Sequence, residues 1–158
     1  MKKLLALALV LGVAGMASAV VTLDPISPTI NIGDTVTISV VADASGNYGG
    51  WLDPVDNGVG TFGDLVILPE AGADASKDFS FDPWWLFEAK SFNPDAPVLA
   101  GAHFTIDFTG TAEGQATLNL WDFDAANVLA TTTITVLIPE PLTVSLLGLG
   151  GLLLRRRR

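Results

Sequence analysis

The segment Thr35-Val36-Thr37-Ile38-Ser39-Val40-Val41-Ala42 carries the pattern that decides the fold of this chain. Small polar and apolar residues alternate along it with a period of two, and most of them are β-branched. This alternation is typical of a strand that has one face on a core and the other on solvent. The segment therefore predicts a half-buried β-strand.

Other segments of the chain show the same alternation or a shorter version of it. The longer ones are residues 102–109, 115–123 and 128–138, and the shorter ones are residues 20–23, 29–32, 48–52, 64–68 and 85–90. Turn-forming residues lie between them, including Asp53-Pro54 and Asp56-Asn57-Gly58. Residues 20–138 show no convincing helical periodicity. The pattern predicts an all-β fold, a single antiparallel β-sandwich of seven to nine strands.

His103 is the only histidine of the chain. Alternation along residues 102–109 places Phe104, Ile106 and Phe108 on the apolar face and His103 on the polar face. We therefore expect a surface histidine. A catalytic histidine would need a nucleophile and an orienting acid beside it, and no sequence motif marks either one.

Residues 20–138 are strongly acidic. They hold 16 of the 17 acidic residues, and Lys77 and Lys90 are their only basic ones, so their formal charge is about −14 against −9 for the whole chain. This charge excludes nucleic acid as a partner, because phosphate binding requires clustered Lys and Arg. The chain has no cysteine, which excludes disulfides, thiol nucleophiles and thiolate metal sites.

The N-terminus has the pattern of a signal peptide. Met1-Lys2-Lys3 forms a basic start, residues 4–13 are apolar, and Ala17-Ser18-Ala19 places Ala17 and Ala19 at the two positions that a signal peptidase reads. The sequence therefore predicts a signal-peptide helix within residues 1–19 and cleavage after Ala19. The mature chain would begin at Val20, and the protein would be exported.

The C-terminus, residues 139–158, has the pattern of a membrane stop. Pro139-Glu140-Pro141 precedes an uncharged apolar run, residues 142–154, which the four arginines end: Arg155, Arg156, Arg157 and Arg158. A helix of these 13 residues reaches only about 20 Å, against a hydrocarbon core of about 30 Å. The sequence thus predicts a short transmembrane helix that suits a temporary hold in the membrane. An ordinary tail anchor is the alternative.

The three parts of this ending together closely resemble the PEP-CTERM sorting signal of exopolysaccharide-producing bacteria. The resemblance implies export, a transient stay in the inner membrane and processing by an exosortase near Pro139-Glu140-Pro141. It also implies delivery to the cell surface or to an extracellular polysaccharide matrix.

The mature domain, residues 20–138, shows a second resemblance. Residues 32–38, 101–106 and 114–118 look like strands of cohesin-like and related Ig-like bacterial domains. Residues 53–75 depart from the cohesin pattern, so the resemblance does not carry over a dockerin-binding face.

Trp84 and Trp85 are the candidate residues for binding a glycan, since tryptophan rings stack on the C–H faces of sugars. Adjacent residues of a strand point to opposite faces, so at most one of the two faces the core. The alternative is that both serve packing. We expect Trp51 and Trp121 to be packing residues.

The loop of residues 122–127 is the candidate metal site. Asp122, Asp124 and Asn127 offer oxygen ligands at a spacing that Ca²⁺ can use. The loop lacks the glycine and the closing glutamate of an EF-type site. The alternative is a polar hairpin connection in which Asp and Asn cap their own backbone.

These observations predict a non-catalytic, exported β-sandwich with a structural or adhesive role, no catalytic residue and no required cofactor. The alternative function is a cohesin-like module that binds a carbohydrate or a partner protein at the cell surface. An exposed tryptophan platform would favour the binding module.

Overall fold

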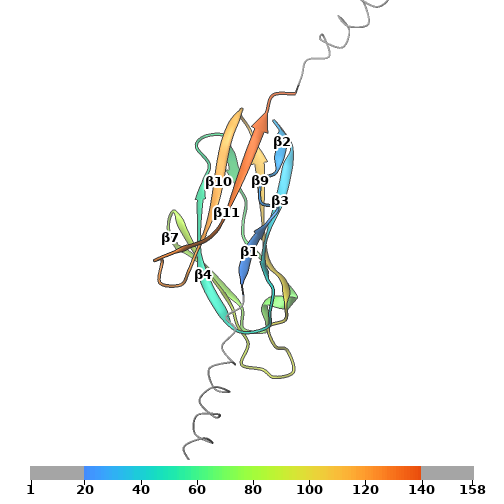
Figure 1. Cartoon of the computed structure of the whole chain (residues 1–158), viewed down its shortest axis with the longest axis vertical. Coiled ribbons are helices and arrows are strands. Elements are labelled where there is room, and N and C mark those ends of the chain that lie inside the picture. The colour runs from blue at the N-terminus through green and yellow to red at the C-terminus, as the bar shows by residue number, and fades with distance from the viewer. Residues whose placement is uncertain (1–19, 140–158) are drawn as a thin grey trace, which may run out of the picture.

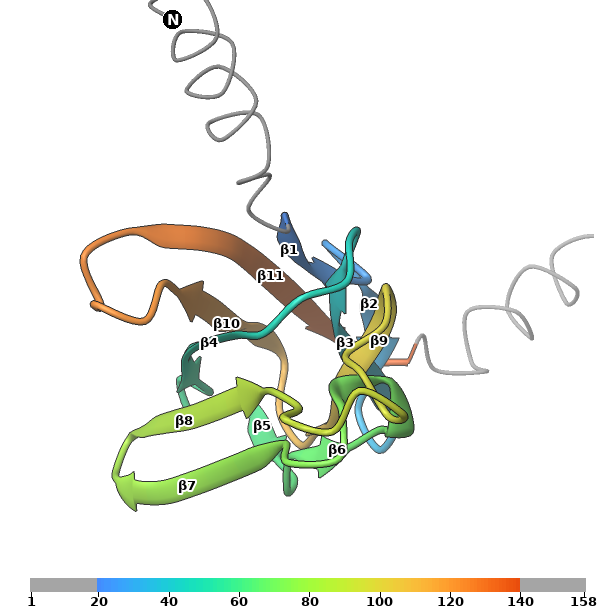
Figure 2. The same cartoon turned by 90° about the horizontal axis from the view of Figure 1, so that it is seen from below.

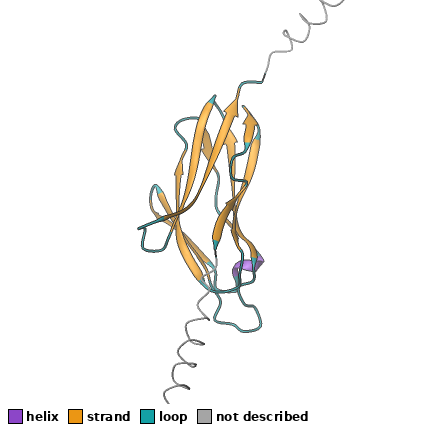
Figure 3. Ribbon diagram, viewed as in Figure 1, coloured by secondary structure: helices purple, strands orange, loops and turns teal. Residues whose placement is uncertain are grey.

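Two β-sheets packed face to face form residues 20–139, the part of the chain that the computed structural model describes (Figure 1). Strands make up nearly all of its regular structure (Figure 3). The predicted signal peptide and the predicted transmembrane helix lie outside the described residues. Within them, no helix is both long enough and apolar enough to cross a membrane.

The first sheet, sheet A, is entirely antiparallel. Its order is β1-β3-β9-β5, and β6 also pairs with β9. The bounds are β1 Val21–Asp24, β3 Thr35–Ala42, β9 Gly101–Gly110, β5 Gly60–Phe62 and β6 Val66–Ile67.

The second sheet, sheet B, has the order β2-β11-β10-β4-β8-β7. Its bounds are β2 Thr29–Asn31, β11 Val128–Leu137, β10 Gly114–Trp121, β4 Tyr48–Val55, β8 Trp84–Ala89 and β7 Ser76–Phe81. β2 pairs with β11 in parallel, so the sandwich is not purely antiparallel, contrary to the prediction. A single 3₁₀ turn, Pro69–Ala71, follows β6. Figure 2 shows the two sheets facing each other.

The core lies between the sheets because each long strand alternates buried and more exposed side chains. Leu65, in the connection between β5 and β6, is fully buried in this core. Both sheets supply its other large, fully buried apolar side chains: Ile38, Leu52, Phe87, Phe104, Ile106, Phe108, Leu118, Leu120 and Ile134. Each such side chain contributes about 1.5–3 kcal/mol relative to an exposed one. Among the described residues, the buried apolar side chains from Val21 to Val136 form one cluster that both sheets share.

The strand predictions are largely confirmed, and the exceptions have local causes. β3 has the predicted bounds, and β9, β10 and β11 differ from prediction by one or two residues at their ends. The sequence missed β5, which has three residues, and β7, whose side chains are mostly exposed and do not alternate. The described residues therefore form eleven strands in place of seven to nine.

The predicted turn at Asp53-Pro54 is wrong, because β4 continues through both residues to Val55. Beyond Leu52, the only described strand that pairs with β4 is β10. Within the described residues, Pro54 thus lies where one side of the strand is unpaired, a position that tolerates proline.

The prediction of a surface His103 is also wrong, since the side chain is 0% exposed. Val40 pairs with Phe104 and Val41 with Ala102, so His103 is an extra residue in β9 with no partner in β3. Such a β-bulge re-aims a side chain. It turns His103 inward, against the alternation of its strand.

Candidate functional site

Four aromatic side chains gather on the outer face of sheet B, and we call them the aromatic face: Trp51 of β4, Phe81 of β7, Trp84 of β8 and Trp121 of β10. Trp51 and Trp121 alternate with the buried Leu52 and Leu120, which places them on the side away from the core. Phe81 is 50% exposed and the three tryptophans are half-buried.

The rings of the aromatic face form a continuous chain of contacts. Trp84 stacks on Trp121, with centroids 5.4 Å apart and planes 27° apart. Trp51 meets Trp84 at 6.3 Å and Phe81 at 5.1 Å, in both cases edge to face. All three separations lie in the favourable range for aromatic pairs. Because β4 lies between β8 and β10, the Trp84–Trp121 contact bridges a whole strand.

Two indole nitrogens of the aromatic face differ in their hydrogen bonding. Trp51 Nε1 donates to the carbonyl of Phe123 at 2.8 Å, which ties the aromatic face to the loop between β10 and β11. Trp121 Nε1 is buried and has no partner among the described residues. Figures 1 and 2 both show this loop and the β7–β8 hairpin projecting on the same side of the molecule.

A polar row continues the same face of sheet B beside the aromatic rings. Thr131 Oγ1 donates to Asn119 Oδ1 at 2.9 Å, and Asn119 Nδ2 donates to Asp53 Oδ2 at 3.3 Å. Asp53 follows Trp51 by two residues and Asn119 precedes Trp121 by two, so all four share the outer face. The polar row therefore consists of Asp53 on β4, Asn119 on β10 and Thr131 on β11. The face thus combines apolar ring surface with fixed hydrogen-bonding groups.

Trp85 belongs to the opposite side of its strand. Its ring packs edge to face against Phe62 at 6.4 Å and Phe79 at 5.5 Å, and it is half-buried against the core. Trp84 and Trp85 therefore do not form a platform together. The sequence predicts Trp84 as a candidate binding residue, but for Trp51 and Trp121 it predicts a packing role. The alternation pattern could have placed Trp121 on the outer face, because it puts Trp121 on the same side of its strand as Thr117 and Asn119.

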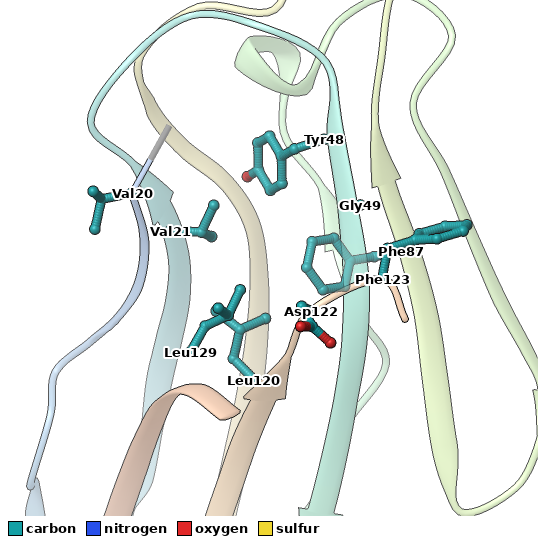
Figure 4. Close-up of a pocket in the computed structure, with 9 residues that line it drawn as sticks. All are labelled: Val20, Val21, Tyr48, Gly49, Phe87, Leu120, Asp122, Phe123 and Leu129. Atoms are coloured by element: carbon teal, nitrogen blue, oxygen red, sulfur yellow. The ribbon is translucent and has the colours of Figure 1, made fainter. Parts of the chain in front are cut away.

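A cavity of about 380 Å³ opens at one end of the sandwich (Figure 4). Its lining is mostly apolar: Val20, Val21, Tyr48, Gly49, Phe87, Leu120, Asp122, Phe123 and Leu129. Tyr48 joins it to His103, because the Tyr48 hydroxyl lies 2.6 Å from His103 Nδ1. Burial raises the pKa of Tyr48 above its ordinary value.

His103 is fully engaged in this arrangement. Its Nε2 lies 2.5 Å from the carbonyl oxygen of Leu99, which can only accept, so Nε2 is the donor of that bond. In the neutral ring with this tautomer, Nδ1 accepts from the Tyr48 hydroxyl. With both ring nitrogens bonded and no exposure, His103 has no free nitrogen to act as a general base. Its role in the fold is structural.

The loop of residues 122–127 is organised by the carboxylate of Asp122. That carboxylate accepts the backbone N–H groups of Ala126 and Asn127, at 2.7 and 3.2 Å, and the side chain of Asn127 at 2.7 Å. The bond from the Asn127 side chain is the main cause that holds the pKa of Asp122 below its ordinary value. This is the geometry of a self-capped hairpin. Among the described residues, no three His, Cys, Asp or Glu side chains are grouped to hold a metal ion. Ca²⁺ binding by Asp122, Asp124 and Asn127 stays a prediction.

The sorting residues lie at or beyond the edge of the described chain. Pro139 is exposed and follows the end of β11 at Leu137, outside the sheet. Glu140, Pro141 and the arginine cluster lie outside the described residues, as do Ala17 and Ala19.

No protein-family model and no curated protein sequence matches this chain. Among solved structures, a non-cellulosomal cohesin from the archaeon Archaeoglobus fulgidus is 14% identical, with a TM-score of 0.48, over 78% of this chain and 94% of its own. The third ScaB cohesin of R. flavefaciens, solved with a group 1 dockerin, is 17% identical, with a TM-score of 0.37, over 78% of this chain and 99% of its own. The C-terminal domain of the Streptococcus pyogenes antigen I/II-family protein AspA is 11% identical, with a TM-score of 0.47, over 73% of this chain and 46% of its own. These likenesses concern the arrangement of the strands.

Proposed function

We propose that this protein is an exported, non-catalytic β-sandwich that binds a neutral polysaccharide chain through the aromatic face of sheet B. The observation that carries the proposal is the continuous set of Trp51, Trp84 and Trp121 rings on the outer face. Binding sites in folded domains combine apolar or aromatic surface with a few convergent polar groups. Here Asp53, Asn119 and Thr131 supply those groups beside the rings.

The charge of the domain selects the kind of polysaccharide. Residues 20–138 carry about −14, and Asp53 itself belongs to the polar row. An acidic polysaccharide would meet like charge at this face, which costs binding energy and slows association. A neutral sugar chain meets no such repulsion and still offers C–H faces to the rings and hydroxyls to the polar row.

Export and sorting complete the proposal. A signal peptide that ends at Ala19 and a sorting signal around Pro139-Glu140-Pro141 would deliver the domain, by way of signal peptidase, the inner membrane and an exosortase, to the cell surface or the polysaccharide matrix. Intact-mass analysis of the protein from its native cells tests this route. A mature chain starting at Val20 and ending near residue 139 is expected; a full-length chain would contradict the route.

Polysaccharide binding is tested separately, with residues 20–139. Tryptophan fluorescence is followed during titration with a neutral β-glucan and, in parallel, with a polyuronate of matched length. We expect a saturable shift with the neutral chain and none with the polyuronate, since three tryptophans line the proposed site. An unchanged emission spectrum with a panel of neutral polysaccharides would contradict the proposal. It would also favour the purely structural role or a protein partner.

A further inference from the structure

Val20, the first residue that the structure describes, is held by Asp43. The backbone nitrogen of Val20 donates to Asp43 Oδ1 at 2.8 Å, and the backbone nitrogen of Asp43 donates to the Val20 carbonyl at 3.1 Å. The two residues extend the antiparallel ladder of β1 and β3 by one position beyond the pair Val21 and Ala42. The nitrogen of Val20 therefore has a fixed carboxylate acceptor.

Asp43 has no cationic partner in the part of the chain that is described. The one salt bridge there joins Lys90 to Glu88. The other lysine, Lys77, donates to the carbonyl of Leu65. In a domain with such an excess of carboxylates, Asp43 thus faces a neutral N–H as long as Val20 is bonded to Ala19.

We infer that Asp43 is the receptor for a new N-terminus at Val20, so that processing itself creates an ion pair that fastens β1 to sheet A. The inference rests on the export step of the proposed function. A signal peptidase hydrolyses the Ala19–Val20 peptide bond with one water molecule. Ala19 leaves as a carboxylate and Val20 keeps an amine, which takes up a proton near neutral pH because α-amines have a pKa of roughly 8.

The conversion strengthens a contact that already has the right geometry. Cleavage replaces a neutral N–H donor with an ammonium, so Coulomb attraction between opposite charges adds to the bond that the Asp43 carboxylate already accepts. Asp43 and Val20 are both exposed, so water and salt reduce the gain. The groups with charge or titratable protons that face Val20 are Asp43, from the β3–β4 connection, and Asp122 and Tyr48, which line the same cavity. At neutral pH none of these groups is a cation that would oppose the new ammonium.

The test compares two forms of the domain that both end at residue 139. One starts at Val20, and the other starts at Val13 and so keeps seven residues of the predicted signal peptide in front. At pH 6.5 and low salt, the form that starts at Val20 is expected to melt about 2–4 °C higher. Asp43→Asn in both forms removes that difference. Asp64→Asn leaves it in place, because the Asp64 side chain is exposed and accepts no hydrogen bond from the residues that the structure describes.

A pH series separates the ion pair from a plain effect of chain length. The ion pair raises the pKa of the Val20 amine, so the added stability is present below about pH 8 and is lost as pH rises through that raised pKa. Equal melting temperatures at pH 6.5, or a difference that persists in Asp43→Asn or at pH 11, would overturn the inference. These measurements do not depend on where the cell cleaves the chain. The intact mass of the exported protein decides that point on its own.

Discussion

Trp84 and Trp121 stack with ring centroids 5.4 Å apart, although β4 separates their strands. Trp84 stacks on the indole of Trp121, whose Nε1 is buried and has no hydrogen-bond partner within residues 20–139. It lies on the outer face of sheet B, so the core does not depend on it. Removing the Trp84 ring should therefore change the surface of the protein much more than its stability.

Tyr48→Phe tests the buried bond between Tyr48 and His103. The substitution leaves His103 Nδ1 without its donor in a fully buried position, so we expect a loss of about 1–3 kcal/mol in the free energy of unfolding. Denaturant unfolding at pH 7 measures it. An unchanged midpoint would show that the bond contributes nothing.

The same pair predicts a dependence on alkaline pH. Burial raises the pKa of Tyr48 above its unfolded value, so the stability linked to its neutral form is present below about pH 10. It is lost as pH rises further. The wild-type protein should therefore lose stability above about pH 10 more steeply than Tyr48→Phe. The melting temperatures of the two proteins are measured as pH rises above about 10. An equal decline in both would contradict this.

Gly50→Ala tests the close approach of β4 and β10 beneath the aromatic face. A Cβ at Gly50 would lie 2.5 Å from the Trp121 carbonyl oxygen and 3.2 Å from the Phe87 ring. Relief requires backbone movement, so we expect a loss of about 1–3 kcal/mol. Gly63→Ala is the matched control, because its Cβ would meet Asp107 at an ordinary 3.5 Å and should cost within about 0.5 kcal/mol. Equal effects of the two substitutions would contradict the contact.

Asp122→Asn tests the self-capped loop. Because its hydrogen bonds depress the pKa of Asp122, the carboxylate stabilises the fold above its unfolded pKa of about 3.9, and this contribution is lost as pH falls through the folded pKa. The wild-type protein should melt above Asp122→Asn at pH 6 and lose its advantage below about pH 4. Asp124→Asn is the control, because Asp124 is exposed in the same loop and its side chain accepts no hydrogen bond from residues 20–139. Calorimetric titration with Ca²⁺ on these variants tests the metal prediction.

The sequence predicts the sandwich well where strands alternate without interruption. β3 and the long strands β9, β10 and β11 follow their pattern closely, because one face of each is buried in a single core. His103 departs from prediction because a bulge inserts one residue into β9, and no local residue type marks such a bulge. β5 has only three residues and the side chains of β7 are mostly exposed, so neither strand leaves an alternating apolar pattern in the sequence.

The candidate site was only partly predictable from the sequence. Trp84 could be proposed from its chemistry, and alternation along β10 already placed Trp121 on the polar side. That Trp84 reaches Trp121 across β4 depends on the order of strands in sheet B, which joins segments far apart in the chain. The sequence does not encode that order locally.

The most direct test of the account is the affinity of Trp84→Ala for the neutral polysaccharide that shifts wild-type fluorescence. The control is Phe92→Ala, which removes an aromatic ring that is 81% exposed and lies outside the aromatic face. Isothermal titration should show at least a tenfold loss of affinity for Trp84→Ala, about 1.4 kcal/mol, and none for Phe92→Ala. Unchanged binding by Trp84→Ala, with the melting temperature preserved, would contradict a glycan site on the aromatic face.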